Sequence, residues 1–405
     1  MQTVIQKYGG SSLSDLTKMA GVADKIAGRR REGARLVVVV SAMGNTTDEL
    51  LRKAKALQSD PHRRELDMLL SSGERMSMSL LSMALHARGL DAISLTGPQS
   101  GILTDDQHTN ANILRVNPHR VHEELDRGRV VIVAGFQGAT KCGEPTTLGR
   151  GGSDTTAVVM AAALGAECCE IYSDVDGVYT ADPRLVEGAT RLDAIGYEEM
   201  EELARQGAAV LHPDSVRAAR ESGVEIRAAA TFREGGFTSI GEPAGQDSAT
   251  AFVSAIAGRR KGARIVCRSR DPRVTSLVRD ALDGHDLVHD QPVRAEGTAA
   301  GAGFDVLVPG ENLPDLEAFA RSLRAQLTEH EHHLDINHGV GTVSAVGAGT
   351  GVCPRLRKRF DEVTRQNGIR VLGTYRTPRS LTCVVPRPLV DDAVRVLHRS
   401  FVEAA

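Results

Sequence analysis

The chain has 405 residues, enough for about two or three domains, and its 49 Lys and Arg nearly balance its 52 Asp and Glu, giving a net charge of −3. This balance argues against nucleic acid or an anionic membrane as a partner, and 3% aromatic residues without Trp argue against single-stranded nucleic acid. The N-terminal MQTVIQKYGG lacks the apolar core of a signal peptide, LVVVV (residues 36–40) is too short to cross a bilayer, and the six cysteines form no CxxC pair. We therefore expect a cytoplasmic protein with reduced thiols and no zinc site.

From residue 1 to about residue 240 the chain alternates buried strands with helices. Apolar runs typical of strands occupy residues 3–7, 36–41, 92–96, 130–136, 169–173 and 225–229, and helical patterns include residues 48–57, 74–88 and 118–127. This alternation predicts an α/β domain over residues 1–240, with a mostly parallel sheet covered by helices on both faces. Ligands then belong at the carboxyl ends of the strands.

The pattern changes after residues 241–251, whose sequence GEPAGQDSATA is typical of a linker. The remaining residues, 252–405, predict two βαββαβ units. Their strands are expected at ARIVCRS, FDVLV, HHLDI, TVSAVGA, GIRVLGTY and SLTCVVP, and their helices at residues 273–282, 313–327, 355–367 and 389–401.

The run LGRGGSDTTA, between a predicted strand and a predicted helix, combines several groups that handle anions. Arg150 is a planar cation suited to a carboxylate or phosphate. The two glycines after it allow a ligand to approach the backbone, Ser153 is placed to cap the next helix, and the Asp154 carboxylate could hold a lysine or a metal. The run therefore predicts a loop that receives a small anion, although an ordinary glycine-rich turn is the alternative.

Two glycines and two hydroxyls follow the first predicted strand in KYGGSS, where Lys7 supplies a cation. Gly9, Gly10 and Ser11 could form a backbone cradle for phosphate oxygens, and the alternative is a tight turn with a solvated lysine. The lysine precedes the glycines, so the motif is not a Walker A loop.

Two further segments offer polar groups near strand ends or helix starts. In SAMGNTTDEL, Ser41 and Thr47 could contact a ligand, or Thr47 could cap a helix that starts at Asp48. In SSGERMS, Glu74 could bind a substrate ammonium, or simply interact with the positive end of its helix.

The segment YSDVDGVYTADPR (residues 172–184) is consistent with a nucleotide-contacting loop after a strand. It is not an EF-hand, because no Glu stands at the twelfth position. The cluster HEHH, with His330, His332 and His333, is best explained as a solvated face or strand start rather than a metal site.

Together these motifs, with TGPQSGILTDD and GFQGATKCGEPTTLGRGGSDTTA, resemble the aspartate kinases of the amino-acid kinase family in order and spacing. The resemblance implies a three-layer amino-acid kinase domain followed by tandem ferredoxin-like ACT domains that mediate homodimerisation or a higher homo-oligomer. It also implies transfer of the ATP γ-phosphate, with Mg²⁺, to the side chain of L-aspartate, giving 4-phospho-L-aspartate for amino-acid biosynthesis. A carboxylate with a pKa near 3.9 is already an ionised nucleophile, so this reaction needs no general base.

The resemblance also implies roles for individual residues, none of which is a resident metal ligand. Lys7 would neutralise the transferred phosphoryl group, and Asp154 would orient Lys7 and the metal-phosphate region. Arg150 would bind the substrate α-carboxylate and Glu74 its ammonium. The rest of the substrate site would comprise Ser41, Thr47, Phe136 and Ser153, and the nucleotide site Lys7, Gly9, Gly10, Ser11, Ser173, Asp174, Tyr179 and Arg184.

The chain departs from the family at four places. Ala209 stands in GAAVLHP where the family carries a second phosphate-contacting lysine, and the RSSF-like run reads AATF (residues 229–232). This predicts reduced activity, or compensation by Arg233 or Arg184. Arg273 and Arg355 replace the glycines of the two ACT effector loops, which predicts weak or absent feedback inhibition by lysine and threonine. A kinase for a related amino-acid carboxylate and a weakened regulatory paralogue remain alternatives.

Overall fold

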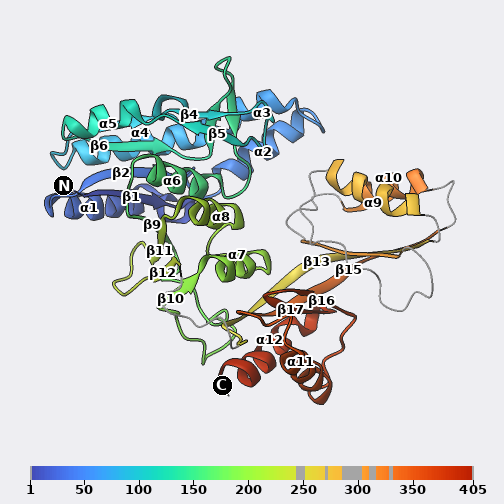
Figure 1. Cartoon of the computed structure of the whole chain (residues 1–405). Coiled ribbons are helices and arrows are strands. Elements are labelled where there is room, and N and C mark those ends of the chain that lie inside the picture. Colours follow the sequence, from blue (N-terminus) through green and yellow to red (C-terminus); the bar gives the residue numbers. More distant parts are fainter. Residues whose placement is uncertain are drawn as a thin grey trace. The chain divides into compact units, whose positions relative to one another are not determined.

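The computed structural model describes residues 2–242, 251–269, 272–284, 303–309, 316–327 and 332–403. They form two compact units, each described here by itself (Figure 1). The N-terminal unit runs to Tyr179 and also contains Arg191–Arg205 and residues 209–242. The C-terminal unit contains Thr180–Thr190, Gln206–Ala208 and the described residues from 251 onward. The chain thus crosses between the units before the boundary expected near residue 240, and most of the expected linker lies outside the described residues.

The N-terminal unit is built on an eight-stranded sheet in the order β10-β12-β11-β9-β1-β2-β6-β3. Its pairs are parallel except for β11 with β12, so the predicted mostly parallel sheet is confirmed. The strands are β1 (Thr3–Tyr8), β2 (Arg35–Val40), β3 (Ala92–Leu95), β6 (Val130–Ala134), β9 (Cys168–Ser173), β10 (Ala194–Gly196), β11 (Glu225–Ala230) and β12 (Thr238–Gly241).

Helices cover both faces of this sheet because alternate residues of its central strands are buried on opposite sides. On one face Val4, Val38 and Ile132 pack with Met19, Val22 and Ile26 of α1 and Leu81 of α4. On the other face α6 packs against β1, β2 and β9. The helices of this unit are α1 (Leu16–Arg31), α2 (Thr46–Leu57), α3 (Arg63–Leu70), α4 (Ser72–His86), α5 (His119–Asp126), α6 (Gly152–Ala163), α7 (Tyr197–Arg205) and α8 (Pro213–Ser222), with a 3₁₀ turn at Gly10–Leu13.

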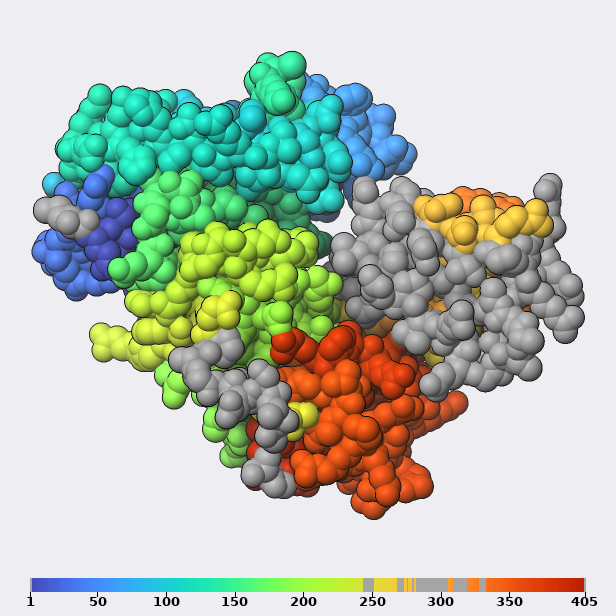
Figure 2. All heavy atoms as spheres, viewed as in Figure 1, coloured from blue at the N-terminus to red at the C-terminus, as the bar shows by residue number. Residues whose placement is uncertain are grey.

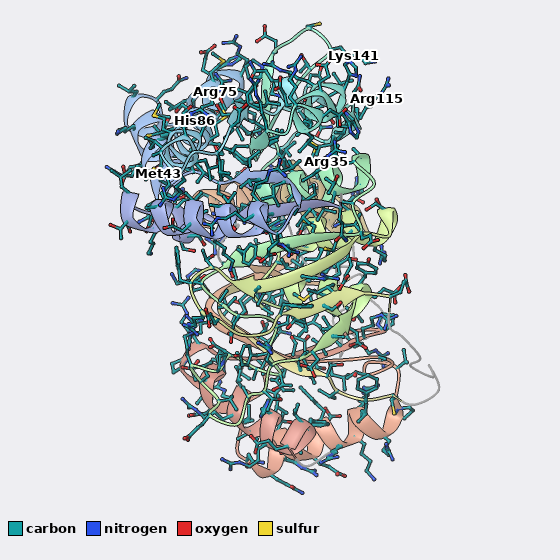
Figure 3. All side chains as sticks on the ribbon, turned by 90° about the vertical axis from the view of Figure 1, so that its left-hand side faces the viewer. Arg35, Met43, Arg75, His86, Arg115 and Lys141 are labelled. Carbon is teal, nitrogen blue, oxygen red and sulfur yellow. The ribbon has the colours of Figure 1, made fainter. Side chains whose placement is uncertain are left out.

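A second sheet of four short strands was not predicted. Its order is β5-β4-β7-β8, and its strands are β4 (Ile102–Thr104), β5 (Ile113–Val116), β7 (Gln137–Ala139) and β8 (Pro145–Thr147). The hairpin between β7 and β8 protrudes from the surface, with Lys141 at its tip (Figures 2 and 3). The predicted strand at residues 130–136 ends early, because Phe136 takes a left-handed φ of 67° and turns the chain into this sheet.

The C-terminal unit contains one five-stranded antiparallel sheet in the order β14-β13-β15-β17-β16. The expected units are therefore not separate, because the two long strands β13 and β15 run through both. Their shared pairing shifts register between Arg259 and Arg264, where a bulge bends a long antiparallel pair. The strands are β13 (Ala255–Ser269), β14 (Gly303–Pro309), β15 (His332–Val346), β16 (Gly373–Thr377) and β17 (Ser380–Pro386).

Each part of this sheet carries its own pair of helices. One core joins Ile265 and Val306 to Val274 and Val278 of α9 (Pro272–Gly284) and Leu323 of α10 (Leu316–Leu327). A second core joins Val343 and Cys383 to α11 (Pro354–Gln366) and α12 (Val390–His398). Two βα modules thus follow the kinase-like unit, in agreement with the predicted fold class. In the histidine cluster, His333 is exposed and His330 lies outside the described residues.

Candidate active site

Lys7, near the carboxyl end of β1, forms an ion pair with Asp154. The Lys7 Nζ lies 2.5 Å from Asp154 Oδ1, and only 11% and 12% of the two side chains are exposed. Asp154 stands in the first turn of α6, where the backbone N–H groups also favour negative charge. The ion pair holds a lysine ammonium close to Gly9, because an ideal Cβ at Gly9 would lie 3.5 Å from its Nζ.

The loop after β1 lies directly against the loop after β2. The Gly44 N–H donates to the Gly10 carbonyl at 3.0 Å, and an ideal Cβ at Gly10 would lie only 2.8 Å from the Ala42 carbonyl oxygen. A side chain at position 10 would therefore push these two loops apart. Ser11 is exposed in the 3₁₀ turn that follows, and its carbonyl accepts a hydrogen bond from the Lys18 ammonium at 3.1 Å.

Glu74 is buried near the start of α4, only 3% exposed. Its Oε1 accepts a hydrogen bond from the Ala42 N–H at 3.0 Å, whereas its Oε2 has no partner among the described residues. Burial raises the pKa of Glu74 to about 7. A buried carboxylate with one unused oxygen is suited to an ammonium ligand, which would restore the charge balance.

The loop that carries Arg150 is shaped by glycines. Gly149 and Gly151 have φ of 74° and 71°, values that side chains rarely adopt. Arg150 itself is exposed and makes no hydrogen bond or ion pair with any residue that the structure describes. Its guanidinium is therefore available for an anionic ligand.

Two predictions about helix caps are wrong. The N-cap of α6 is Gly151 rather than Ser153, which lies inside the first turn, and the left-handed glycine begins the helix without a side-chain cap. Likewise α2 begins at Thr46, so Thr47 does not cap it, and the Thr46 hydroxyl donates instead to the Met43 carbonyl at 2.7 Å. Thr47 and Ser41 are both partly exposed in this segment.

Phe136 and Ser153 pack around the start of α6. The Phe136 N–H donates to the Thr156 hydroxyl at 3.1 Å, and an ideal Cβ at Gly152 would lie 3.0 Å from the Phe136 ring. Gly135 leaves room for Ser153, whose Oγ would lie 2.8 Å from a Cβ at that position. These two predicted substrate residues are thus brought to the same helix terminus as Asp154.

The predicted nucleotide residues fall into both units. The Gly9 N–H donates to the Tyr172 carbonyl at 3.2 Å, which places the segment containing Ser173 and Asp174 beside the glycine loop. The Tyr179 hydroxyl donates to the Asp176 carboxylate at 3.0 Å. Arg184 instead belongs to the C-terminal unit, where it forms a salt bridge with Asp182 at 2.9 Å.

Ala209 is exposed in the connection between α7 and α8 and carries no cation. Arg233, one of the two arginines proposed to compensate, is also exposed and close enough to lower the pKa of Tyr179 against the larger effect of burial. Arg184, the other arginine, pairs with Asp182 within the C-terminal unit.

Sequence reasoning missed Asp67, whose carboxylate is completely buried beside the Arg150 loop. It accepts hydrogen bonds from Thr147 and Thr109 and pairs with His108. The only signal was an acidic residue within the apolar run LDMLL (residues 66–70), and the partners of this residue lie far away along the chain.

The site fits Mg²⁺ bound with a nucleotide. Mg²⁺ prefers oxygen ligands and takes most of them from phosphates and water, with one or two carboxylates from the protein. Asp154 in the first turn of α6 and the exposed Asp174 after β9 supply carboxylates of this kind.

None of the helices in the described part of the chain has the length and apolar character that a membrane span requires.

Comparison with known proteins agrees with this geometry. Residues 2–229 match the model of the amino acid kinase family, so the chain belongs to that family. Relatives that align over nearly the whole chain show which members of this family it is similar to. The chain is 38% identical to an aspartokinase of Geobacillus stearothermophilus, covering 99% of this chain and 97% of that protein, and 38% identical to one of Corynebacterium glutamicum, covering 99% and 96%. Within the family it is therefore an aspartokinase.

The solved structures include a similar fold over almost the whole chain. E. coli aspartokinase III, crystallised with aspartate and ADP, superposes with a TM-score of 0.81, covers 98% of this chain and 99% of that protein, and is 23% identical. This likeness supports the fold of both units.

Proposed function

We propose that the chain transfers the γ-phosphoryl group of ATP to the side-chain carboxylate of L-aspartate, giving 4-phospho-L-aspartate. The observation that carries this proposal is the buried Lys7–Asp154 ion pair beside the glycine loop, at the carboxyl end of β1. The aspartokinase relatives at 38% identity over 99% of the chain support the same reaction.

Two opposite charges would recognise the α-amino acid. Arg150 is exposed and available for the α-carboxylate, to which its planar guanidinium could donate two parallel hydrogen bonds. One oxygen of Glu74 has no hydrogen-bond partner in the part of the chain that the structure describes, and that oxygen would accept a hydrogen bond from the α-ammonium. Ser41, Thr47, Phe136 and Ser153 would complete the substrate site and leave the side-chain carboxylate facing the nucleotide.

The reaction needs positioning and charge neutralisation more than acid-base catalysis. The aspartate side chain is ionised at neutral pH, and one of its carboxylate oxygens would attack the γ-phosphorus directly. The bond between the γ-phosphorus and the β-γ bridging oxygen would break, and ADP would leave. Lys7, held by Asp154, would neutralise charge on the transferred group. Asp154 and Asp174 would hold the Mg²⁺ ion that accompanies the nucleotide, and this ion would supply further positive charge beside the phosphates.

The nucleotide would lie along the glycine loop and the end of β9. Gly9, Gly10 and Ser11 would cradle its phosphates, and Ser173, Asp174, Tyr179 and Arg184 would hold the remainder. We further propose that the protein is a cytoplasmic homodimer or higher homo-oligomer. The strands β14 and β16 stand at the two edges of the C-terminal five-stranded sheet, and edge strands of this kind can pair with another chain, which supports association through that sheet.

The test is ATP turnover by the purified protein with Mg²⁺ and L-aspartate, trapping the acyl phosphate as its hydroxamate. Parallel reactions contain L-glutamate or no amino acid. We expect hydroxamate only with L-aspartate. A product with L-glutamate instead would identify a kinase for a related carboxylate, and nucleotide binding without any product would indicate a regulatory paralogue.

A further inference from the structure

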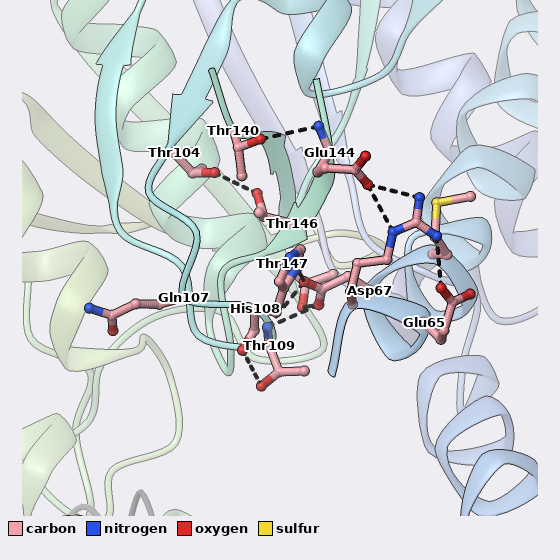
Figure 4. Close-up of polar contacts among 12 residues, drawn as sticks. Glu65, Asp67, Thr104, Gln107, His108, Thr109, Thr140, Glu144, Thr146 and Thr147 are labelled. Atoms are coloured by element: carbon pink, nitrogen blue, oxygen red, sulfur yellow. Dashed lines mark hydrogen bonds and ion pairs between the residues drawn. The ribbon is translucent and has the colours of Figure 1, made fainter. Parts of the chain in front are cut away.

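A buried polar cluster to which no substrate or nucleotide role has been given surrounds Asp67 on α3 (Figure 4). Asp67 is 0% exposed, and three residues form hydrogen bonds with its carboxylate. Its Oδ1 accepts from the Thr147 hydroxyl at 2.6 Å and from the Thr109 N–H at 3.0 Å, and its Oδ2 lies 2.6 Å from His108 Nδ1. Burying a carboxylate is unfavourable unless hydrogen-bond donors compensate for the water that it loses. The carboxylate therefore depends on all three hydrogen bonds together.

The donors lie on the two segments that support the Arg150 loop. Thr147 is the last residue of β8, and the loop begins directly after it. His108 and Thr109 belong to the connection between β4 and β5, where Thr109 has a left-handed φ of 72°. The next residue, Asn110, packs against Gly149, because an ideal Cβ at Gly149 would lie 2.6 Å from its Oδ1. The Asp67 carboxylate therefore ties together both sides of the loop's base.

On its own side of the cluster, Asp67 is joined to Glu74. Helix α3 passes into α4 at Ser71, and Glu74 stands in the first turn of α4. The Ser71 carbonyl accepts a hydrogen bond from the Gln137 side chain at 3.1 Å, which ties this junction to β7. The Ser71 N–H also donates to the Asp67 carbonyl at 3.0 Å. The chain thus runs directly from Glu74 on α4 through this junction to Asp67, whose carboxylate is hydrogen-bonded to Thr147 at the start of the Arg150 loop.

We propose that Asp67 is a positioning residue that fixes the Arg150 loop relative to Glu74. It thereby sets the spacing between the two charges that bind the α-carboxylate and α-ammonium of the substrate. This inference rests on the proposed function, because those two charges recognise an α-amino acid there. Asp67 acts through Thr147, Thr109 and His108 and does not touch the substrate.

The direct variant Asp67→Asn could fail to fold, since its amide would present a donor to groups that already donate. Substituting Thr147 is a milder test, because Asp67 then loses only one of its three hydrogen-bonding residues. Thr147→Val keeps the shape and removes the hydroxyl, whereas Thr147→Ser keeps the hydroxyl. Thr146→Val is the matched control: Thr146 is equally buried on the same strand, and its hydroxyl bonds Thr104 at 2.6 Å instead.

The experiment measures KM for L-aspartate, KM for ATP and thermal stability in the wild type and these three variants. We expect Thr147→Val to raise KM for L-aspartate about tenfold while KM for ATP stays within about twofold. Thr147→Ser should have the wild-type KM for L-aspartate. Thr146→Val should lower the thermal stability and leave KM for L-aspartate unchanged. Equal KM values in Thr147→Val and Thr146→Val, or no rescue by serine, would overturn the proposal.

A second readout separates this proposal from the proposed function. Calorimetric titration of L-aspartate into the same proteins gives a Kd that does not depend on turnover. If the wild type binds L-aspartate without phosphorylating it, the proposed reaction fails, whereas a tenfold weaker Kd in Thr147→Val still supports the positioning role. An unchanged Kd in that variant, or no binding of L-aspartate by the wild type, overturns the positioning role.

Discussion

Lys7 on β1 and Asp154 on α6 form an ion pair at 2.5 Å in which each partner is almost completely buried. Removing one partner leaves the other as an uncompensated buried charge and lets the Lys7 ammonium move away from the phosphate loop. We therefore expect Asp154→Asn to lower kcat about 10²-fold, measured by the hydroxamate assay.

The control for this variant is Asp126→Asn. Asp126 pairs with Arg35 at 2.7 Å, but its side chain is 70% exposed, so its ion pair contributes little. We expect its kcat to equal that of the wild type. A similar loss in both variants would show that the effect of Asp154→Asn does not depend on its place beside Lys7.

We expect the raised pKa of Glu74 to make the binding of L-aspartate sensitive to pH. Burial raises the pKa of its carboxyl group from 4.5 to about 7, so Glu74 is partly protonated near neutral pH in the enzyme without substrate. Only the ionised form pairs with an ammonium, so KM for L-aspartate should fall as the pH rises from 6 to 8, by up to about tenfold per unit on the acid side. Glu74→Gln should bind more weakly, by about tenfold or more, and lose this pH dependence. An unchanged pH profile in Glu74→Gln would contradict the assignment.

Ala209 provides a test by restoration. The position is exposed between α7 and α8, so a lysine side chain can be placed there without being buried. If it lies near the transferring phosphates, as the resemblance implies, Ala209→Lys should raise kcat, by about tenfold. Ala209→Met, similar in length but uncharged, is the control. Equal rates in the wild type and both variants would mean that the position no longer contributes to catalysis.

The central sheet and the Lys7, Glu74 and Arg150 motifs could be predicted because their signals are local. Each lies in a short run of apolar or glycine-rich sequence with a characteristic neighbour. Asp67 could not be predicted in this way, because its partners His108 and Thr147 come from separate segments that meet only in the folded chain. The short strands β4, β5, β7 and β8 were missed for a related reason: three or four residues carry too little periodicity.

The errors at helix starts have a different origin. Ser153 and Thr47 are good capping residues by type, but Gly151 and Asn45 occupy the N-cap positions. At Gly151 the left-handed φ decides where the helix begins, and a capping propensity cannot reveal that angle. Likewise the continuous β13 and β15 depend on pairing across both modules, which two separate apolar runs do not indicate.

Regulation by amino acids should be weak. Arg273 and Arg355 are exposed in the first turns of α9 and α11, directly after Pro272 and Pro354. A side chain at these positions crowds the backbone N–H groups that would bind an effector. We expect millimolar lysine or threonine to leave the initial rate nearly unchanged. Arg355→Gly tests the steric reason: if it introduces inhibition, the arginine excludes the effector, and strong inhibition of the wild type would refute the prediction.

Two glycine-to-alanine substitutions in the same unit should have opposite effects. At Gly10 the added Cβ would lie 2.8 Å from the Ala42 carbonyl and 3.2 Å from the Gly44 carbonyl, both backbone atoms that cannot rotate away. Gly10→Ala should therefore separate the loops after β1 and β2, destabilise the fold by about 1–3 kcal/mol and raise KM for ATP.

Gly28 lies within α1 and has nothing within 4 Å of its ideal Cβ. Gly28→Ala should stabilise the fold by roughly 0.5–1 kcal/mol, since alanine is the better helix former, and leave both KM values unchanged. Urea unfolding and steady-state kinetics on the two variants measure both effects. If Gly10→Ala were as stable and active as Gly28→Ala, close contact between the two loops would not be required for nucleotide binding.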